Sequence, residues 1–419
     1  MLRRPIYYGW PMLIGVSVAQ VVSWGTLYYA FSVFVAPMHT ELGWTTVELT
    51  GAYSLALLCS GLAAVPVGRW VDKHGTRALM TAGSLAGALL VVAWSQVRSL
   101  PSFYLLMAGV GVVSAAVLYE PAFAIVAIWF RRLRGRALTL LTFFGAFASF
   151  IFIPLSTWLV TASGWRGALL ALAGILAGVT LPIHALLLRS RPAAIGLLVD
   201  GDVAARSIAE RPTEERSATP QAALREPRFW LLTAAFGASA FASVTMTVHL
   251  IPYLIGRGHS ASFAATVAGL FGLTSLLGRM TIGPLAERIA RRWVTAGLIG
   301  MQVAGMLALA IAGDSAAGAL LYVALFGAGA GTLTILRAAL LAEHYGPANY
   351  GTINGAQNLA LTGARALAPV GAWLLAAALG GYAALLWGLA CLLLGGTCAV
   401  LLTRDPTPAP ELDARSRPV

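Results

Sequence analysis

Twelve long apolar runs constrain what this chain can fold into. A helix needs about 20 mostly apolar residues to cross the hydrocarbon core of a bilayer, and each run is close to that length. Hydrophobic residues make up 58% of the sequence and charged residues 11%, unlike the composition of a soluble domain. The predicted membrane-spanning helices cover residues 10–37, 47–67, 78–97, 102–130, 137–161, 167–188, 229–256, 262–285, 294–313, 316–342, 352–378 and 382–402.

The positive charges are distributed unevenly between the connecting segments. If the N-terminus is cytoplasmic, 22 of the 28 Lys and Arg residues fall on the cytoplasmic side, and only Arg98, Arg166 and Arg257 fall outside. This bias follows the positive-inside rule and predicts that both termini are cytoplasmic. It also accounts for the net charge of +12 without nucleic-acid binding. The remaining three arginines, Arg279, Arg337 and Arg365, lie inside predicted spans of the second half.

The two halves of the chain match each other at an offset of 215 residues. The matched pairs are Gly68 with Gly283, Asp72 with Glu287, Phe130 with Tyr345, Pro154 with Pro369 and Trp158 with Trp373. A repeat of this kind is typical of transporters. We therefore expect an all-α membrane protein with twelve transmembrane helices in two pseudo-symmetric six-helix bundles. The bundles are residues 1–189 and 228–403, joined by a polar linker at 190–227 and followed by a cytoplasmic tail at 404–419.

The loop between the second and third runs carries the motif "GRWVDKHGTR". Glycine allows two helices to approach closely, and a carboxylate is stabilised at the N-terminal end of a helix, so the segment suits a gate between bundles. The alternative is a solvated run of charges. Gly68, Asp72, Gly75 and Arg77 match the G-x-x-x-D-x-x-G-x-R loop of the major facilitator superfamily, which the chain resembles over nearly its whole length. The segment "GPLAERIARR" repeats the motif more loosely through Gly283, Glu287 and Arg288.

Within that superfamily, four stretches resemble the monocarboxylate-transporter group with its bacterial lactate and oxalate/formate relatives. They are "YYGWP", "WFRRLRGRA", "VHLIPYL" and "GRMTIG". The last places Arg279 where the group keeps the arginine that binds the substrate carboxylate. The proton-carrying pair of the animal members is absent, because Ser275 and Tyr29 stand at or near the positions of their aspartate and lysine. Both residues are candidates to line the substrate site, and proton coupling must use another group.

Arg279 is the leading candidate to bind substrate. It lies nine residues before Arg288, which puts it about 13 Å deep at 1.5 Å per residue. A charged arginine at that depth is expected to face a water-filled cavity, and its planar fork suits a carboxylate. The alternative is a permanent ion pair between helices, for which Glu120 is the expected partner.

Glu120, in "VLYEPAF", is the candidate for proton coupling. It lies eleven residues before Arg131, or about 16 Å from the inner surface. Burial favours the neutral form of a carboxylic acid, so such a group can take up and release protons. The alternative is a protonated glutamate that hydrogen-bonds a neighbouring helix. Pro121 predicts a kink beside it, and Tyr119 either donates to the same anion or packs in the core.

Three further charged or titratable residues lie within predicted spans. His249, eight residues before Arg257, is a candidate for substrate binding or proton coupling, because histidine changes charge between about pH 5 and 8; the alternative is a hydrogen-bonded core histidine. Arg365 lies about 20 Å along its helix from Thr352, a depth that indicates a place in the cavity. Arg337, close to Glu343 and to the inner end of its helix, is expected to be a structural or snorkelling charge.

These features predict a membrane transporter that moves a small organic anion, a monocarboxylate, by alternating access as a proton symporter. We expect a multi-pass protein of a bacterial inner membrane, whose partners are the anion, protons and the lipid bilayer. No catalytic residues, metal, cofactor or nucleic acid are expected. One alternative is a dicarboxylate or oxalate-type exchanger, which would explain Arg365. A drug or metabolite exporter is the other, although such exporters usually have acidic cavities.

Overall fold

The computed structural model describes residues 7–202, 217–282, 289–379 and 381–403, and these contain helices without any strand. The first half begins with α1 (Gly9–Trp24), a π-helical turn η1 (Gly25–Tyr29), α2 (Phe31–Leu42), α3 (Thr46–His74) and α4 (Thr76–Ser95). It continues with α5 (Leu100–Val117), α6 (Tyr119–Trp129), α7 (Arg134–Pro182) and η2 (Ile183–Leu187). The short elements η3 (Pro192–Ile195), η4 (Val199–Gly201) and α9 (Pro220–Arg225) follow. The second half comprises α10 (Pro227–Gly256), α11 (Ala261–Ile282), α12 (Arg291–Ala312), α13 (Ala316–Tyr345), α14 (Tyr350–Leu379) and α15 (Tyr382–Leu402).

The predicted number of membrane crossings is confirmed. Ten segments of the described chain are long and apolar enough to cross a membrane. The longest, Arg134–Leu187, has 54 residues and turns at Gly164, where φ is 69° and ψ is 169°, so it forms two crossings. Helix α14, with 30 residues and Arg365 near its middle, adds one more. The structure therefore has the twelve membrane-spanning helices expected from the apolar runs, while their orientation across the membrane stays a prediction.

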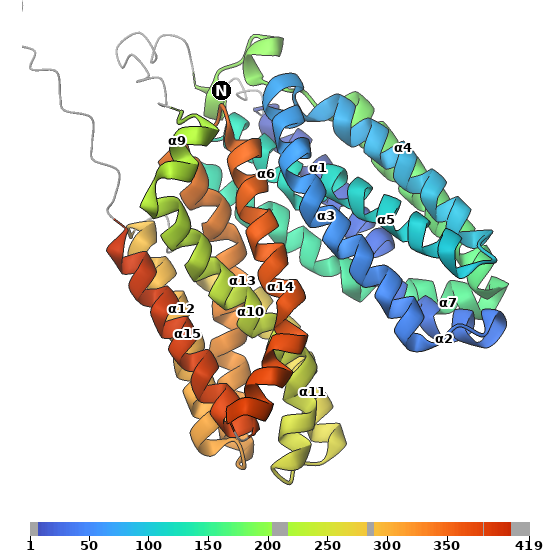
Figure 1. Ribbon diagram of the computed structural model, residues 1–419. Helices are drawn as coiled ribbons and strands as arrows, with labels where there is room; N and C mark the ends of the chain where they lie inside the picture. Colours follow the sequence, from blue (N-terminus) through green and yellow to red (C-terminus); the bar gives the residue numbers. More distant parts are fainter. Residues whose placement is uncertain (1–6, 203–216, 283–288, 380, 404–419) are drawn as a thin grey trace, which may run out of the picture.

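The apolar core consists of three clusters of buried side chains. One contains only residues of α1 to α7, and a second contains only residues of α10 to α15. The third joins both halves, because Phe123, Phe130 and Met12 of the first half pack in it with Tyr345 and Ile353 of the second. In Figure 1 the halves converge at the end that carries the start of α1 and α9, and they diverge toward the opposite end. We call the converging end the linker end.

Helices α3 and α14 form the closest contact between the two halves. A Cβ atom added to Gly68 would lie 2.0 Å from the carbonyl oxygen of Gly351, so only glycine fits at this crossing. Farther along the same two helices, Gly355 faces Ala64 and Gly61 faces Thr362. The halves therefore touch along several turns on the linker side.

Two irregularities interrupt the first and fourth predicted spans. The interruption predicted near Pro121 is found at Leu118, whose extended backbone (φ −82°, ψ −153°) separates α5 from α6. The side-chain amide of Gln20 donates a hydrogen bond to the carbonyl oxygen of Val117 there (2.8 Å). A polar side chain thus supplies a hydrogen bond where the helix is interrupted. The other irregularity is η1, where Gly25 leaves room for the ring of Phe152.

The described parts of the linker attach to equivalent loops of the two halves. The carboxylate of Asp200 accepts hydrogen bonds from the backbone N–H groups of Arg131 and Arg132 (3.2 and 2.8 Å), after α6. C-terminal to residue 216, the N–H of Ala218 donates to the carbonyl oxygen of Tyr345 (2.9 Å), the last residue of α13. These loops correspond to each other at the offset of 215 residues.

Candidate functional site

Arg279 bridges the two halves of the protein. It lies near the end of α11, and its Nε donates to the carbonyl oxygen of Gly331 on α13 (3.0 Å). Its Nη1 donates to the carbonyl oxygen of Thr142 on α7, in the first half (3.0 Å). Arginine has five N–H donors, so these two contacts leave donors free for a further acceptor. In the described residues no carboxylate forms an ion pair with Arg279.

Glu120 pairs with Arg337, which contradicts the alternative in which Arg279 forms a permanent ion pair with Glu120. The Nη2 atom of Arg337 on α13 lies 3.2 Å from Oε1 of Glu120 on α6, with side-chain exposures of 7% and 17%. Asn354 on α14 donates its amide to the same carboxylate and accepts from Arg337 Nη1 (2.9 Å). The pair therefore joins the two halves with hydrogen bonds on several sides, as a buried ion pair requires.

Arg337 is a buried structural charge and not a snorkelling one. Its side chain is only 7% exposed, so it does not reach toward the membrane surface. The carboxylate of Glu343, expected to lie close to it, pairs instead with Arg291 on α12 (2.6 Å). Arg337 also approaches Gln357 (3.5 Å), which extends the polar network along α14.

Aromatic side chains of the first half gather beside Arg279. The ring of Trp24 lies 5.0 Å from that of Tyr28, 6.3 Å from that of Tyr29 and 5.0 Å from that of Tyr119. Tyr29 and Tyr119, both named as candidates, interact electrostatically with the guanidinium of Arg279. The sequence did not single out Trp24 and Tyr28 as candidates, although both lie in the run "WGTLYY". Trp24 directly precedes the π-helical turn, and Tyr28 lies in it. Such turns are frequent at functional sites.

Tyr119 is held by packing as well as by charge. Its ring stacks on that of Phe123 at 5.2 Å, with an angle of 6° between the planes. Its hydroxyl lies in a notch over Gly145 of α7, where an added Cβ would come within 2.0 Å of it. The notch therefore positions the hydroxyl by packing, and Tyr119 also interacts electrostatically with Arg279, so packing and anion binding are compatible roles.

Arg365 interacts with both halves of the protein. It is an exposed residue near the middle of the 30-residue helix α14, and it interacts electrostatically with Glu120, Arg337 and Tyr28. A cation at that depth is expected to contact water or an anion and not lipid. Three arginines of the second half, Arg279, Arg337 and Arg365, thus interact with described residues of the first half, and Arg337 does so through the carboxylate of Glu120.

His249 and Ser275 are placed differently from the expectation. His249 on α10 is 8% exposed, and its Nδ1 lies 3.3 Å from the hydroxyl of Tyr382 on α15, within the second half. The hydroxyl of Ser275, one turn before Arg279, donates to the carbonyl oxygen of Gly327 on α13 (3.0 Å). Both side chains are thus engaged between helices of one bundle.

The gate motif lies at the α3–α14 contact. The carboxylate of Asp72 accepts hydrogen bonds from the backbone N–H groups of Gly351 and Thr352 (2.7 Å each), at the N-terminus of α14. A carboxylate at a helix N-terminus of the other bundle is the geometry expected from the motif. Gly75 has a positive φ of 78°, and Arg77 donates to the carbonyl oxygen of Ala185 (2.6 Å). Gly283, Glu287 and Arg288, the repeat of the motif, lie outside the described residues.

Two helical bundles that close around buried charges of opposite sign define a membrane transporter. The chain belongs to the Major Facilitator Superfamily, whose family model matches residues 16–369 and 240–418. Within the described residues, no group of three His, Cys, Asp or Glu side chains could hold a metal ion.

The comparisons with individual proteins show the same class. Monocarboxylate transporter 12 of Xenopus laevis is 23% identical over 67% of this chain, which spans 63% of that relative's length, less than two thirds. The oxalate:formate antiporter of Oxalobacter formigenes is 24% identical over 71% of this chain and 69% of its own. The crystal structure of the transporter FucP in the outward conformation is similar with a TM-score of 0.71, at 14% identity over 94% of this chain and 99% of that one.

Proposed function

We propose that this protein is a secondary active transporter that carries a small organic anion, a monocarboxylate, together with a proton by alternating access. The observation that carries the proposal is Arg279, a membrane-embedded arginine with free donors, bonded across the two halves and flanked by Tyr29 and Tyr119. A planar guanidinium beside two phenol groups suits one carboxylate. The names of the related monocarboxylate transporters support this class of substrate.

Glu120 is the group that we propose carries the proton. In the described conformation its charge is balanced by Arg337 across the contact between the halves. When the linker end opens, α6 and α13 separate and Glu120 loses that partner. An unpaired carboxylate in a membrane is costly, so Glu120 takes up its proton before the separation, while the end opposite the linker is open. The substrate carboxylate then compensates the arginines that Glu120 no longer neutralises.

A dicarboxylate or oxalate-type exchanger is the second candidate. The specific observation that favours it is Arg365, since three arginines around a single carboxylate leave two positive charges for a ligand to balance. The similarity to an oxalate:formate antiporter points the same way.

The contact between Asp72 and α14 is proposed to act as the gate of the linker end. Its bonds to Gly351 and Thr352 exist only while α3 and α14 are in contact, so it stabilises one of the two alternating states. The positive-inside bias predicts that this end is cytoplasmic, and the outward conformation named for FucP would be the matching state. The arginine-rich composition and short loops favour a bacterial inner membrane.

Uptake into proteoliposomes tests the function. Radiolabelled lactate, pyruvate, oxalate and malonate are offered with and without an imposed pH gradient. Stimulation of lactate or pyruvate uptake by external acid supports symport, whereas uptake that requires internal anion supports exchange. Arg279→Ala is expected to abolish binding, and Arg279→Lys to restore little of it, because a point charge lacks the two-pronged geometry. Arg98→Ala, on the opposite side from the linker, is the control. Retained affinity in a folded Arg279→Ala protein contradicts the site.

Proton coupling has its own test in Glu120→Gln, which imitates the protonated acid. This variant should still exchange labelled for unlabelled substrate, since both half-cycles run with the site loaded. It should lose accumulation driven by a pH gradient. If accumulation persists, Glu120 is not the coupling group, and the same pair of assays on His249→Gln comes next.

A further inference from the structure

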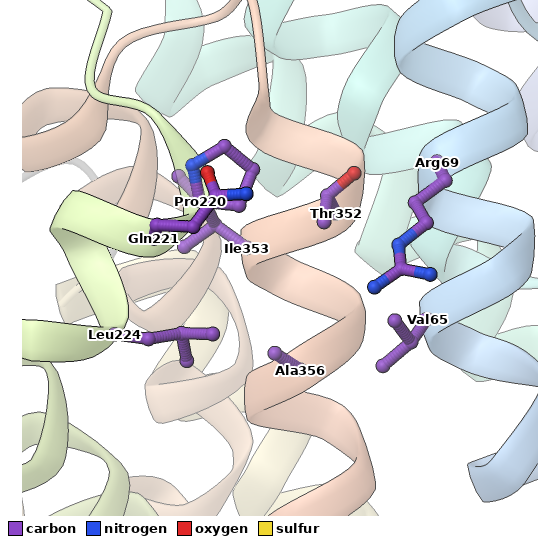
Figure 2. A pocket seen from close by; sticks show the side chains of 8 residues that line it. All are labelled: Val65, Arg69, Pro220, Gln221, Leu224, Thr352, Ile353 and Ala356. Carbon is purple, nitrogen blue, oxygen red and sulfur yellow. The ribbon is translucent and has the colours of Figure 1, made fainter.

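A groove of about 270 Å³ lies on the outside of the α3–α14 contact, separate from the charges between the halves. Figure 2 shows its three walls: Val65 and Arg69 on α3, Thr352 and Ala356 on α14, and Gln221 and Leu224 on α9. The first half, the second half and the linker therefore each supply a part of it. A ligand in this groove would contact all three at once.

One end of the groove is cationic. Arg69 is an exposed side chain whose guanidinium points toward α14 in Figure 2, and it forms no hydrogen bond or ion pair with a described residue. It lies five residues before His74, the last residue of α3, or about 7 Å from the helix end. Its neighbour Trp70 is 45% exposed, as is usual for tryptophan at the level of lipid headgroups. This end of the groove is thus at the membrane interface.

The other end of the groove is apolar. Val65 lies one turn farther from the helix end than Arg69, and Ala356 lies one turn farther along α14 than Thr352 (Figure 2). Leu224 on α9 is 37% exposed and closes the third side. A ligand that fits this arrangement has an anionic group at the interface and an apolar body directed into the hydrocarbon.

The charges around the groove favour an anion. Lys73 on α3 and Arg225 on α9 are exposed cations nearby. Among the described carboxylates, Asp72 is bonded to the N-terminus of α14, and Glu226 is an exposed residue after α9.

We propose that the groove binds the phosphodiester headgroup of an anionic phospholipid, phosphatidylglycerol in a bacterial membrane, with an acyl chain along Val65 and Ala356. Arginine pairs with phosphate oxygens through two parallel N–H donors, and the polar side chains of Gln221 and Thr352 lie on the facing walls. Because both halves and the linker build the groove, a bound lipid stabilises the conformation in which α3 and α14 are in contact.

The test uses the full-length protein in nanodiscs and in detergent. Native mass spectrometry measures how much phosphatidylglycerol remains bound compared with phosphatidylcholine. Arg69→Gln should lower retention by about tenfold, because a charged hydrogen-bonding partner is lost. Ala356→Phe keeps every charge but fills the apolar end, and it should lower retention to the same extent. Lys73→Gln removes an adjacent charge that does not line the groove, and it should change retention by less than about fivefold.

A second measurement follows the proposed effect on conformation. Spin labels on the ends of α3 and α14 should report a larger fraction in contact in phosphatidylglycerol than in phosphatidylcholine nanodiscs, and Ala356→Phe should remove the difference. Equal losses in Arg69→Gln and Lys73→Gln, or full retention in Ala356→Phe, would show only general surface attraction and overturn the site. Displacement of the lipid by millimolar inorganic phosphate would assign the groove to free phosphate instead. Thermal unfolding of each variant confirms that it is folded.

Discussion

The buried pair between Glu120 and Arg337 allows a quantitative prediction. Arg337→Met keeps much of the volume of the side chain but removes its charge and its bonds to Glu120 and Asn354. Breaking a buried ion pair by removing one partner costs about 3–5 kcal/mol. Glu120 is 17% exposed, so water reduces the cost of leaving it without its partner, and we expect the lower end, about 3 kcal/mol. The pair joins α6 to α13. Its removal should therefore destabilise the conformation in which the linker end is closed, relative to the open one.

A loss of about 3 kcal/mol corresponds to a shift of roughly 100-fold in the equilibrium between the closed and open linker end. Electron paramagnetic resonance distances between labels at His74 and Ala348 measure that shift, in a background where Cys59, Cys391 and Cys398 are replaced by serine. The distribution should move from short to long distances.

The double variant Glu120→Gln/Arg337→Met separates the pair from other effects. Replacing both charges of a buried pair is often nearly neutral, so the double variant should lie closer to the wild type than Arg337→Met alone. Arg291→Met, which removes a more exposed pair within the second half, should leave the distances unchanged. Effects of the two single changes that add to within about 0.5 kcal/mol would refute the coupling.

Three further changes test the contacts between helices. Gly68→Ala places a methyl group 2.0 Å from the carbonyl oxygen of the facing glycine on α14 and should open the linker end. Gly174→Ala is the control, because an added Cβ there meets no atom within 4 Å. The yield of cross-links between α3 and α14 measures the opening. Asp72→Asn should weaken the closed state by about 1 kcal/mol through loss of charge at a helix N-terminus, without changing which substrates compete for uptake. Gly145→Ala should displace the hydroxyl of Tyr119 and weaken substrate binding by about tenfold with little loss of stability, as isothermal titration and thermal unfolding can show.

The sequence was sufficient for the fold because membrane-spanning helices depend on local composition. The apolar runs located the crossings, and the turn at Gly164 falls between two predicted spans. The π-helical turn at Gly25–Tyr29 could not be located in this way, because it depends on the ring of Phe152 occupying the space over Gly25 from another helix.

The partners of the buried charges were less predictable than the charges themselves. Depth along a helix singled out Glu120, Arg279 and Arg365, and Arg337 was correctly placed inside a span. The arginine that pairs with Glu120 depends on how α6 and α13 are rotated relative to each other. A local sequence pattern does not predict that rotation. Ser275 illustrates the same limit, since its place in the family pattern did not show that its hydroxyl bonds to Gly327.

The separation of Glu120 from its partner in the sequence has a consequence for biosynthesis. Glu120 precedes Arg337 by 217 residues, so at 5–20 residues per second a ribosome needs about 10 to 40 s to deliver the partner. Throughout that interval the first bundle holds a carboxylic acid in the membrane without its counter-ion. The neutral acid is the less costly form there, and the nascent chain is therefore expected to insert Glu120 with a proton that it releases when the second bundle docks. Neither bundle is electrostatically complete by itself, which makes the assembly of the two halves the final step of folding.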